Sequence, residues 1–102
     1  MTETLLQSAT NAAQMLRRRE ISSRELTEML LSRIDAVNPA INAVVEFRVE
    51  EALAEASAAD GAIANGGELG PLHGVPMTIK YSFNAAGLHT TWGDSAFKDF
   101  VA

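Results

Sequence analysis

The chain contains no cysteine, so it offers no disulfide framework, no thiolate metal site and no thiol nucleophile. No stretch approaches the roughly 18 apolar residues that a membrane span requires. The N-terminal segment MTETLLQSATNAAQ carries an early Glu3 and has no basic region leading into an apolar run, as a secretory signal would. These absences predict a cytoplasmic protein that does not enter a membrane.

A strong charge bias is also absent, because the formal net charge is only -5. The chain has no basic stripe, which argues against nucleic acid or an anionic membrane as a partner. The run Arg17–Arg19 is better explained by the dipole of a helix C-terminus and by solvation. Apolar residues make up 47% and charged residues 21%, so neither disorder nor a fibrous class is indicated.

Helical periodicity dominates the first forty residues. A helix is predicted over residues 5–19, with an inward stripe of Leu5, Ala9, Ala12, Ala13 and Leu16. Ser22 and Glu25 have capping-box spacing, so a second helix should begin at about Ser23. Its inward positions are Leu26, Met29, Leu30, Ile34 and Val37. Asn38-Pro39 should end it, since the residue before a proline disfavours helical geometry.

The next segments differ in composition. INAVVEF, residues 41–47, is rich in β-branched and aromatic residues, which predicts a short strand, with a lead-in to the next helix as the alternative. Alanine dominates residues 49–64 and predicts a helix that Gly66-Gly67 closes. The inward stripe is small: Ala52, Leu53, Ala56, Ala59 and Ile63. Glu55 and Asp60 are expected to be solvated.

The stretch from Gly70 to Gly93 is arranged differently from the helical segments. Turn residues lead into Met77, Thr78, Ile79 and Lys80, a short run typical of a strand with Lys80 at its end. Such a lysine usually points into water. In a desolvated cleft, however, its neutral amine would be favoured and could accept a proton.

The motif GPLHGVP at residues 70–76, then Thr78-Ile79-Lys80, Ala86-Gly87 and Thr90-Thr91, resembles the first sequence block of the amidase signature family. That pattern sets about a dozen positions in order and is far more specific than a glycine motif alone. The resemblance implies that Lys80 is the distal base of a Ser-cisSer-Lys triad. In such a triad the lysine amine takes up, through a bridging serine, the proton of the serine that attacks an amide carbonyl. The family usually has an acidic residue after the lysine, where this chain has Tyr81.

The residues after Lys80 form a loop-like pattern. His73 and His89 lie sixteen residues apart with no third ligand evident, which argues against zinc; we expect no metal and no cofactor. His73 is interpreted as a turn residue whose ring bonds to the backbone. Thr90 and Thr91 should bond to loop backbone or line a pocket, and Trp92 should be a core or rim residue. Asp94 should cap a helix that starts near the C-terminus.

By resemblance the fold is α/β, with N-terminal helices packed on the first strands of an incomplete α/β/α sandwich around a mixed sheet. Residues 1–102 would form a partial amidase domain. Residues 1–68 are the helical cover with one short strand, 69–93 the lysine-bearing strand and loops, and 94–102 the start of a truncated helix.

The resemblance also implies that both triad serines lie downstream, in glycine- and serine-rich segments. None of the serines present has that context: Ser8, Ser22, Ser23, Ser32, Ser57, Ser82 and Ser95. We therefore expect an N-terminal amidase portion that is inactive alone, whose complete enzyme acts on a small-molecule amide. Unpaired strand edges would favour self-association. The alternative is a noncatalytic binding or assembly module that kept part of the fold; Tyr81 and the short length favour it.

Overall fold

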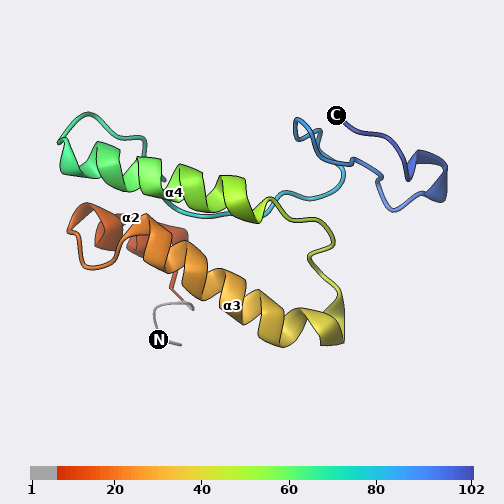
Figure 1. The fold of residues 1–102 in the computed structure, drawn as a ribbon, viewed down its shortest axis with the longest axis horizontal. Helices are drawn as coiled ribbons and strands as arrows, with labels where there is room; N and C mark the ends of the chain where they lie inside the picture. The colour runs from red at the N-terminus through yellow and green to blue at the C-terminus, as the bar shows by residue number, and fades with distance from the viewer. Residues whose placement is uncertain (1–6) are drawn as a thin grey trace. The chain divides into compact units, whose positions relative to one another are not determined.

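The structure, a computed structural model, describes residues 7–102. Its regular elements there are α2 (Ala9–Arg17), α3 (Ser23–Ile41), α4 (Val49–Ala64) and the short 3-10 helix η1 (Ser95–Phe97) (Figure 1). The described chain divides into two compact units. Residues 7–43 and 48–76 form the first unit, and residues 44–47 and 77–102 form the second.

Helix α2 is shorter at both ends than its periodicity predicts. The Ser8 hydroxyl accepts a hydrogen bond from the Asn11 amide at 3.1 Å and caps the helix. At the other end, Arg19 has a φ of 59°, in the left-handed region, which a helix cannot continue through. Leu5, the first residue of the predicted stripe, lies outside the described residues. Ala13 and Leu16 are buried as predicted.

Helix α3 starts with the predicted capping box. The Glu25 amide donates to Ser22 Oγ at 3.0 Å, and the Ser22 amide donates to Glu25 Oε1 at 3.2 Å. The predicted end at Pro39 is wrong, because the helix runs on to Ile41. Asn42 closes it in the left-handed conformation, with its amide bonded to the Asn38 carbonyl at 2.6 Å. The proline lies in the last turn, where it removes one helical bond without stopping the chain.

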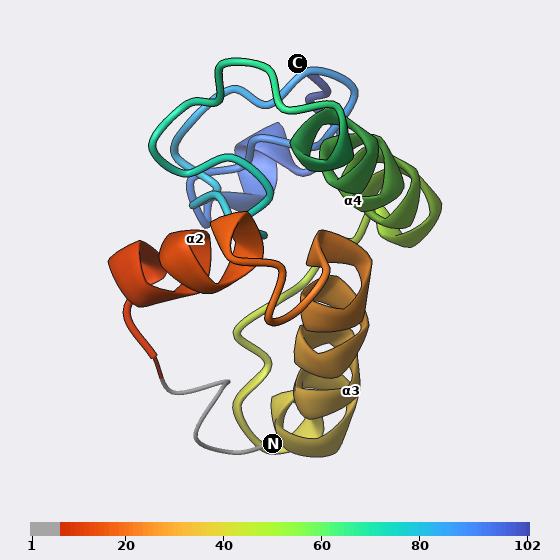
Figure 2. The same ribbon diagram turned by 90° about the vertical axis from the view of Figure 1, so that its left-hand side faces the viewer.

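Helix α4 spans the alanine-rich segment as predicted, and Gly66 follows it with a φ of 72°. Helices α3 and α4 pack against each other (Figure 1). Figure 2 shows the short turn that joins α2 to α3. The core of the first unit takes one residue from each helix: Leu16, Leu26 and Ile63. Partly buried residues surround them: Ala12, Ile21, Leu30, Leu69 and Val75. The Gly-Pro segment after α4 is therefore packed onto the three helices.

The predicted N-terminal helices are present, but the predicted strands and sheet are not seen in residues 7–102. Ile41 ends α3, and residues 42–47 and 77–80 have no regular secondary structure. Strand-type pairing within 7–102 is limited to an isolated antiparallel bridge between His89 and Val101. A β-branched pattern reports how well side chains fit a pleated sheet, and it needs neighbouring strands to receive the backbone hydrogen bonds. The described residues provide no such neighbour.

Two further features complete the fold. The helix start expected after Asp94 is present as the single turn η1, where Asp94 Oδ1 accepts from the Ala96 amide at 2.9 Å. No helix within residues 7–102 combines the length and apolar character that a membrane crossing requires.

Candidate active site around Lys80

The loop at residues 70–74, which we call the Gly-Pro loop, leads toward Lys80 and belongs to the first unit. Helices α2, α3 and α4 each contribute one hydrogen bond that holds it. These bonds join Arg17 Nη2 to the Gly70 carbonyl (2.7 Å), Ser23 Oγ to the Gly74 carbonyl (2.6 Å) and His73 Nε2 to the Ala59 carbonyl (3.0 Å). The prediction that the His73 ring bonds to backbone is therefore confirmed.

Gly74 is required by its surroundings. Its φ of 81° lies in the left-handed region that favours glycine. A Cβ at this position would lie 3.3 Å from Leu16 Cδ1 and 3.4 Å from Ser23 Cβ. A larger residue here would strain the backbone of the loop and crowd α2 and α3.

Asp60 has a structural role that the sequence did not suggest. Its Oδ1 accepts a hydrogen bond from the Ser23 amide at 2.6 Å, and its Oδ2 accepts from the Arg24 amide at 3.2 Å. The expectation that Asp60 is merely solvated is therefore wrong. A carboxylate at a helix N-terminus satisfies free amides and interacts well with the helix dipole. Glu55, by contrast, is exposed and pairs with Arg48 at 3.7 Å.

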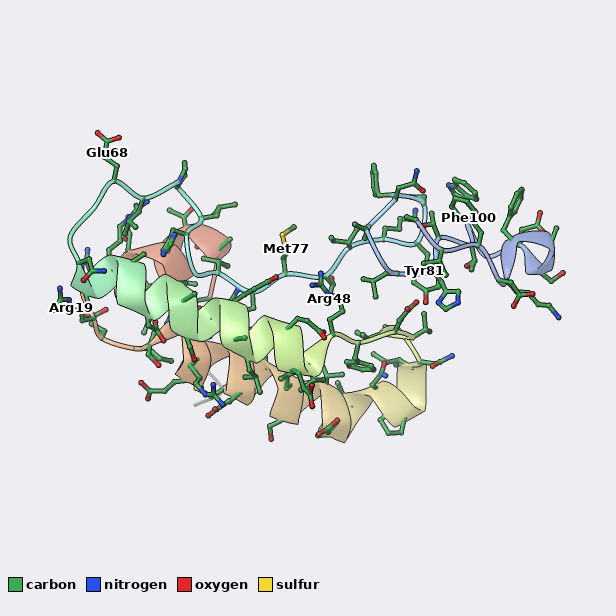
Figure 3. The ribbon with its side chains drawn as sticks, turned by 45° about the horizontal axis from the view of Figure 1, so that its top comes forward. Arg19, Arg48, Glu68, Met77, Tyr81 and Phe100 are labelled. Atoms are coloured by element: carbon green, nitrogen blue, oxygen red, sulfur yellow. The ribbon has the colours of Figure 1, made fainter. Side chains whose placement is uncertain are left out.

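Lys80 lies in a segment of the second unit that has no regular secondary structure, and it is exposed. The predicted desolvated cleft at a strand end is not formed by residues 7–102. Within that range the Lys80 ammonium makes no ion pair or hydrogen bond. The apolar residues before it are exposed as well, Met77 at 79% and Ile79 at 52%. Figure 3 shows the Met77 side chain projecting away from its backbone segment.

Tyr81, directly after Lys80, donates its hydroxyl hydrogen bond to Glu46 Oε2 at 2.6 Å. The Glu46 carboxylate also accepts from the His89 backbone amide at 3.2 Å and lies 3.1 Å from His89 Nδ1. These hydrogen bonds lower the pKa of Glu46 below its usual 4.5; the bond from the Tyr81 hydroxyl has the largest effect and the His89 side chain the second largest. The same bond to Glu46 raises the pKa of Tyr81 above its usual 10.0. The turn after Lys80 is therefore bonded to a carboxylate, but this carboxylate belongs to Glu46 and not to the residue directly after the lysine.

Trp92 and Thr90 hold the turn that follows Lys80. The Trp92 amide donates to the Tyr81 carbonyl at 3.2 Å, and its indole nitrogen donates to the Ser82 carbonyl at 2.9 Å. Thr90 is fully buried, and its hydroxyl donates to the Phe83 carbonyl at 3.4 Å. Trp92 itself is 51% exposed, as expected of a rim residue. The prediction that Thr90 bonds to loop backbone is confirmed.

Aromatic packing supports this part of the second unit. The Trp92 ring meets Phe97 edge-on, with centroids 5.2 Å apart, and stacks on Phe100 at 6.4 Å. An open hollow of about 640 Å³ lies nearby in the same unit, lined among others by Glu46, Tyr81 and His89. Lys80 does not line it. The other polar residues that line it are Thr91, Asp94, Ser95 and Lys98.

Residues 7–102 hold no cluster of three or more His, Asp or Glu side chains placed to bind a metal ion. Both histidines are engaged elsewhere, His73 with the Ala59 carbonyl and His89 with Glu46.

Sequence reasoning missed Glu46 and Asp60. The available signal at Glu46 was an acidic residue inside the apolar run INAVVEF, since a charge in an apolar segment usually needs a partner. Asp60 lies between Ala59 and Gly61 in the alanine-rich helix, and nothing in that local sequence points to the start of α3, 37 positions earlier, which it caps.

Comparison with known proteins gives a consistent result. The family described as Amidase matches residues 25–102. A glutamyl-tRNA(Gln) amidotransferase subunit from Alkalilimnicola ehrlichii is 50% identical over 88% of this chain and 18% of its own length. An acylamidase of Rhodococcus erythropolis is 41% identical over 93% of this chain and 20% of its own. An indoleacetamide hydrolase of Bradyrhizobium diazoefficiens is 47% identical over 93% of this chain and 18% of its own length.

The chain spans only about a fifth of the length of these relatives. The match nevertheless includes the Gly-Pro loop, Lys80 and the turn after it, the features that the motif singled out. The chain belongs to the amidase family.

Proposed function

We propose that this chain supplies the lysine of an amidase that hydrolyses carboxamide C–N bonds, with Lys80 as the distal base of a Ser-cisSer-Lys triad. The observation that carries this proposal is the position of Lys80 at the end of the motif that begins at Gly70, inside the matched residues 25–102. The named relatives include an acylamidase and an indoleacetamide hydrolase, both named for reactions at amides. This agreement supports amide hydrolysis as the reaction class.

In the proposed mechanism, the neutral amine of Lys80 accepts a proton through a bridging serine. The second serine, now deprotonated, attacks the carbonyl of the substrate amide and forms an acyl-enzyme. The ammonia or amine of the substrate leaves with that proton. Water then releases the acid. The two serines and the oxyanion-binding amides belong to segments outside residues 1–102, so this chain alone should be inactive.

The exposed amine of Lys80 is consistent with a base whose serine partners belong to other segments of the enzyme. It makes no ion pair within residues 7–102, so it is available to a hydroxyl group that the remaining enzyme brings. Covering the exposed Met77 and Ile79 would also remove water around Lys80, and a lysine in such surroundings gives up its proton more readily. The proposed reaction uses no metal or cofactor, takes a small-molecule amide and takes place in the cytoplasm.

The test uses an active enzyme, obtained by extending the reading frame or by supplying this chain with serine-bearing segments of the family. Lys80→Ala should lower kcat by about 10²- to 10⁴-fold, the usual contribution of a positioned base. Lys98→Ala is the matched control, because the chain has only these two lysines, and it should retain activity. Full turnover by the Lys80→Ala enzyme would rule out the assignment. The 102-residue chain alone should show no turnover.

A further inference from the structure

The turn after Lys80 is held at successive carbonyls. The Lys80 carbonyl accepts from the Phe83 amide at 3.0 Å, while Trp92 donates to the next two carbonyls, 81 and 82, at 3.2 Å and 2.9 Å. Trp92 does so with a φ of 50°, a left-handed conformation that is uncommon for a bulky residue. Such a conformation persists only where the surroundings hold it. The backbone at Lys80 is therefore held by its neighbours rather than by its own side chain.

The side chain of Tyr81 provides a second contact that stabilises this turn. Its hydroxyl lies 2.6 Å from Glu46 Oε2, in a segment far away in the sequence. Glu46 is itself fixed, since its side chain is only 22% exposed and two nitrogens of His89 lie within hydrogen-bond distance of the carboxylate. Hydrogen bonds to an ionised carboxylate are roughly twice as strong as those between neutral groups. Tyr81 thus joins the residue next to Lys80 to a well-anchored carboxylate.

We propose that Glu46, acting through the Tyr81 hydroxyl, is a positioning residue that sets where the Lys80 amine emerges from the turn. The inference rests on the function proposed for Lys80. A base must lie within hydrogen-bond reach of the hydroxyl that it serves, and a displacement of about 1 Å costs about 10²-fold in rate. Lys80 makes no side-chain bond within residues 7–102, so its backbone turn carries this positioning.

The first test measures the turn in the 102-residue chain. Glu46→Gln and Tyr81→Phe each weaken the link with little change in volume; Tyr81→Phe leaves the Glu46–His89 contacts in place and is the milder variant. Hydrogen exchange of the Trp92 amide and indole N–H should become about tenfold faster in both, the effect of one lost charge-assisted bond. Helix amides of the first unit, such as that of Leu26, should not change and report whether the chain still folds. Glu55→Gln is the control, since that side chain is 72% exposed.

The second measurement follows the amine itself. The chain has two lysines, so mass spectrometry can compare acetylation at Lys80 with that at Lys98 in one sample. The Lys80-to-Lys98 ratio should change at least twofold in Glu46→Gln and Tyr81→Phe, and stay constant in Glu55→Gln. Unchanged exchange at Trp92 together with an unchanged labelling ratio would overturn the proposal.

The third test uses the active enzyme described above. Glu46→Gln should lower kcat about tenfold and leave KM within about twofold, because misplacing a base affects the chemical step rather than binding. An unchanged kcat, with Lys80→Ala inactive, would overturn the positioning role alone. Full activity of Lys80→Ala would instead remove the proposed function, whatever the exchange data show. The two failures are therefore distinguishable.

Discussion

Asp60 Oδ1 lies 2.6 Å from the backbone nitrogen of Ser23, so a carboxylate of α4 closes the start of α3, 37 positions earlier in the chain. The first amides of a helix have no partners inside the helix. Ser22 satisfies one of them from the helix's own sequence, and Asp60 satisfies two more from outside. The start of α3 is thus also a point where two helices are joined.

We expect Asp60→Ala to lower the free energy of unfolding by about 1–2 kcal/mol, the usual cost of removing a helix cap. Urea denaturation followed by circular dichroism measures it. Glu55→Ala removes a carboxylate from the same helix at an exposed position, where an ion pair contributes about 0–1 kcal/mol. Equal effects of the two substitutions would show that Asp60 does not cap α3.

Gly74→Ala should destabilise the first unit by about 1–3 kcal/mol, because the new Cβ meets Leu16 and Ser23 and the backbone has a positive φ. The midpoint of thermal unfolding measures the effect. Gly67→Ala is the control, since nothing lies within 4 Å of its added Cβ. A Gly74→Ala protein as stable as the Gly67→Ala protein would contradict the close approach.

Gly61→Ala should stabilise the protein by about 0.5–1 kcal/mol. Gly61 lies inside α4, an added Cβ there meets nothing within 4 Å, and glycine in a helix costs about that much relative to alanine. The same urea titration measures it. A loss of stability would mean that α4 is packed more tightly at this position than the structure shows.

The bond between Tyr81 and Glu46 predicts a window of pH stability for the second unit. The folded pKa of Glu46 lies below 4.5, so its contribution is present above that pH and is lost as the pH falls through the folded value. The folded pKa of Tyr81 lies above 10.0, so its contribution is present below pH 10 and is lost as the pH rises through the raised value. Fluorescence of Trp92, the only tryptophan, should change at both limits.

Tyr81 is also the only tyrosine, so absorbance of the phenolate reports its titration directly. In Glu46→Gln its pKa should return toward 10, since the main cause of the shift is removed. An identical titration in both proteins would show that the bond does not form in solution.

Self-association of the 102-residue chain is expected from the exposure of Met77 and Ile79, because contiguous exposed apolar side chains favour contacts between molecules. Sedimentation velocity over a range of concentrations measures it. Met77→Ser with Ile79→Thr should shift the distribution toward monomer, while Thr78→Ser, at an exposed polar position of the same segment, is the control. A concentration-independent monomer with a cooperative melting transition would contradict the expectation.

Local signals predicted much of the first unit. The capping box at Ser22 and the alanine-rich helix depend on residues near each other in sequence or on strong intrinsic preferences. The sequence also predicted that the His73 ring bonds to backbone, but not that its partner is the Ala59 carbonyl, 14 positions earlier. Local signals were not sufficient for residues 41–47 and 77–80, which were predicted to be strands. Their β-type pattern needs partner strands, and the described residues contain none.

The motif predicted Lys80 as a site residue. It did not predict which groups surround the Lys80 side chain. Whether its amine is buried depends on groups distant in sequence, as does the link from Tyr81 to Glu46 across 35 positions. A single sequence shows that Glu46 is an acid in an apolar run, but it does not name the tyrosine that the acid binds.

The Gly-Pro loop, bonded once to each of three helices, has a consequence for proteolysis. Cleavage requires several residues of backbone to leave the surface and enter a protease, and the loop at 70–74 could do so only by detaching from all three helices at once. Residues 65–68 have no such attachments to side chains and include the outward-pointing Glu68 (Figure 3). A glutamate-specific protease should therefore nick the chain just before the loop and leave the lysine-bearing segment intact on its own fragment.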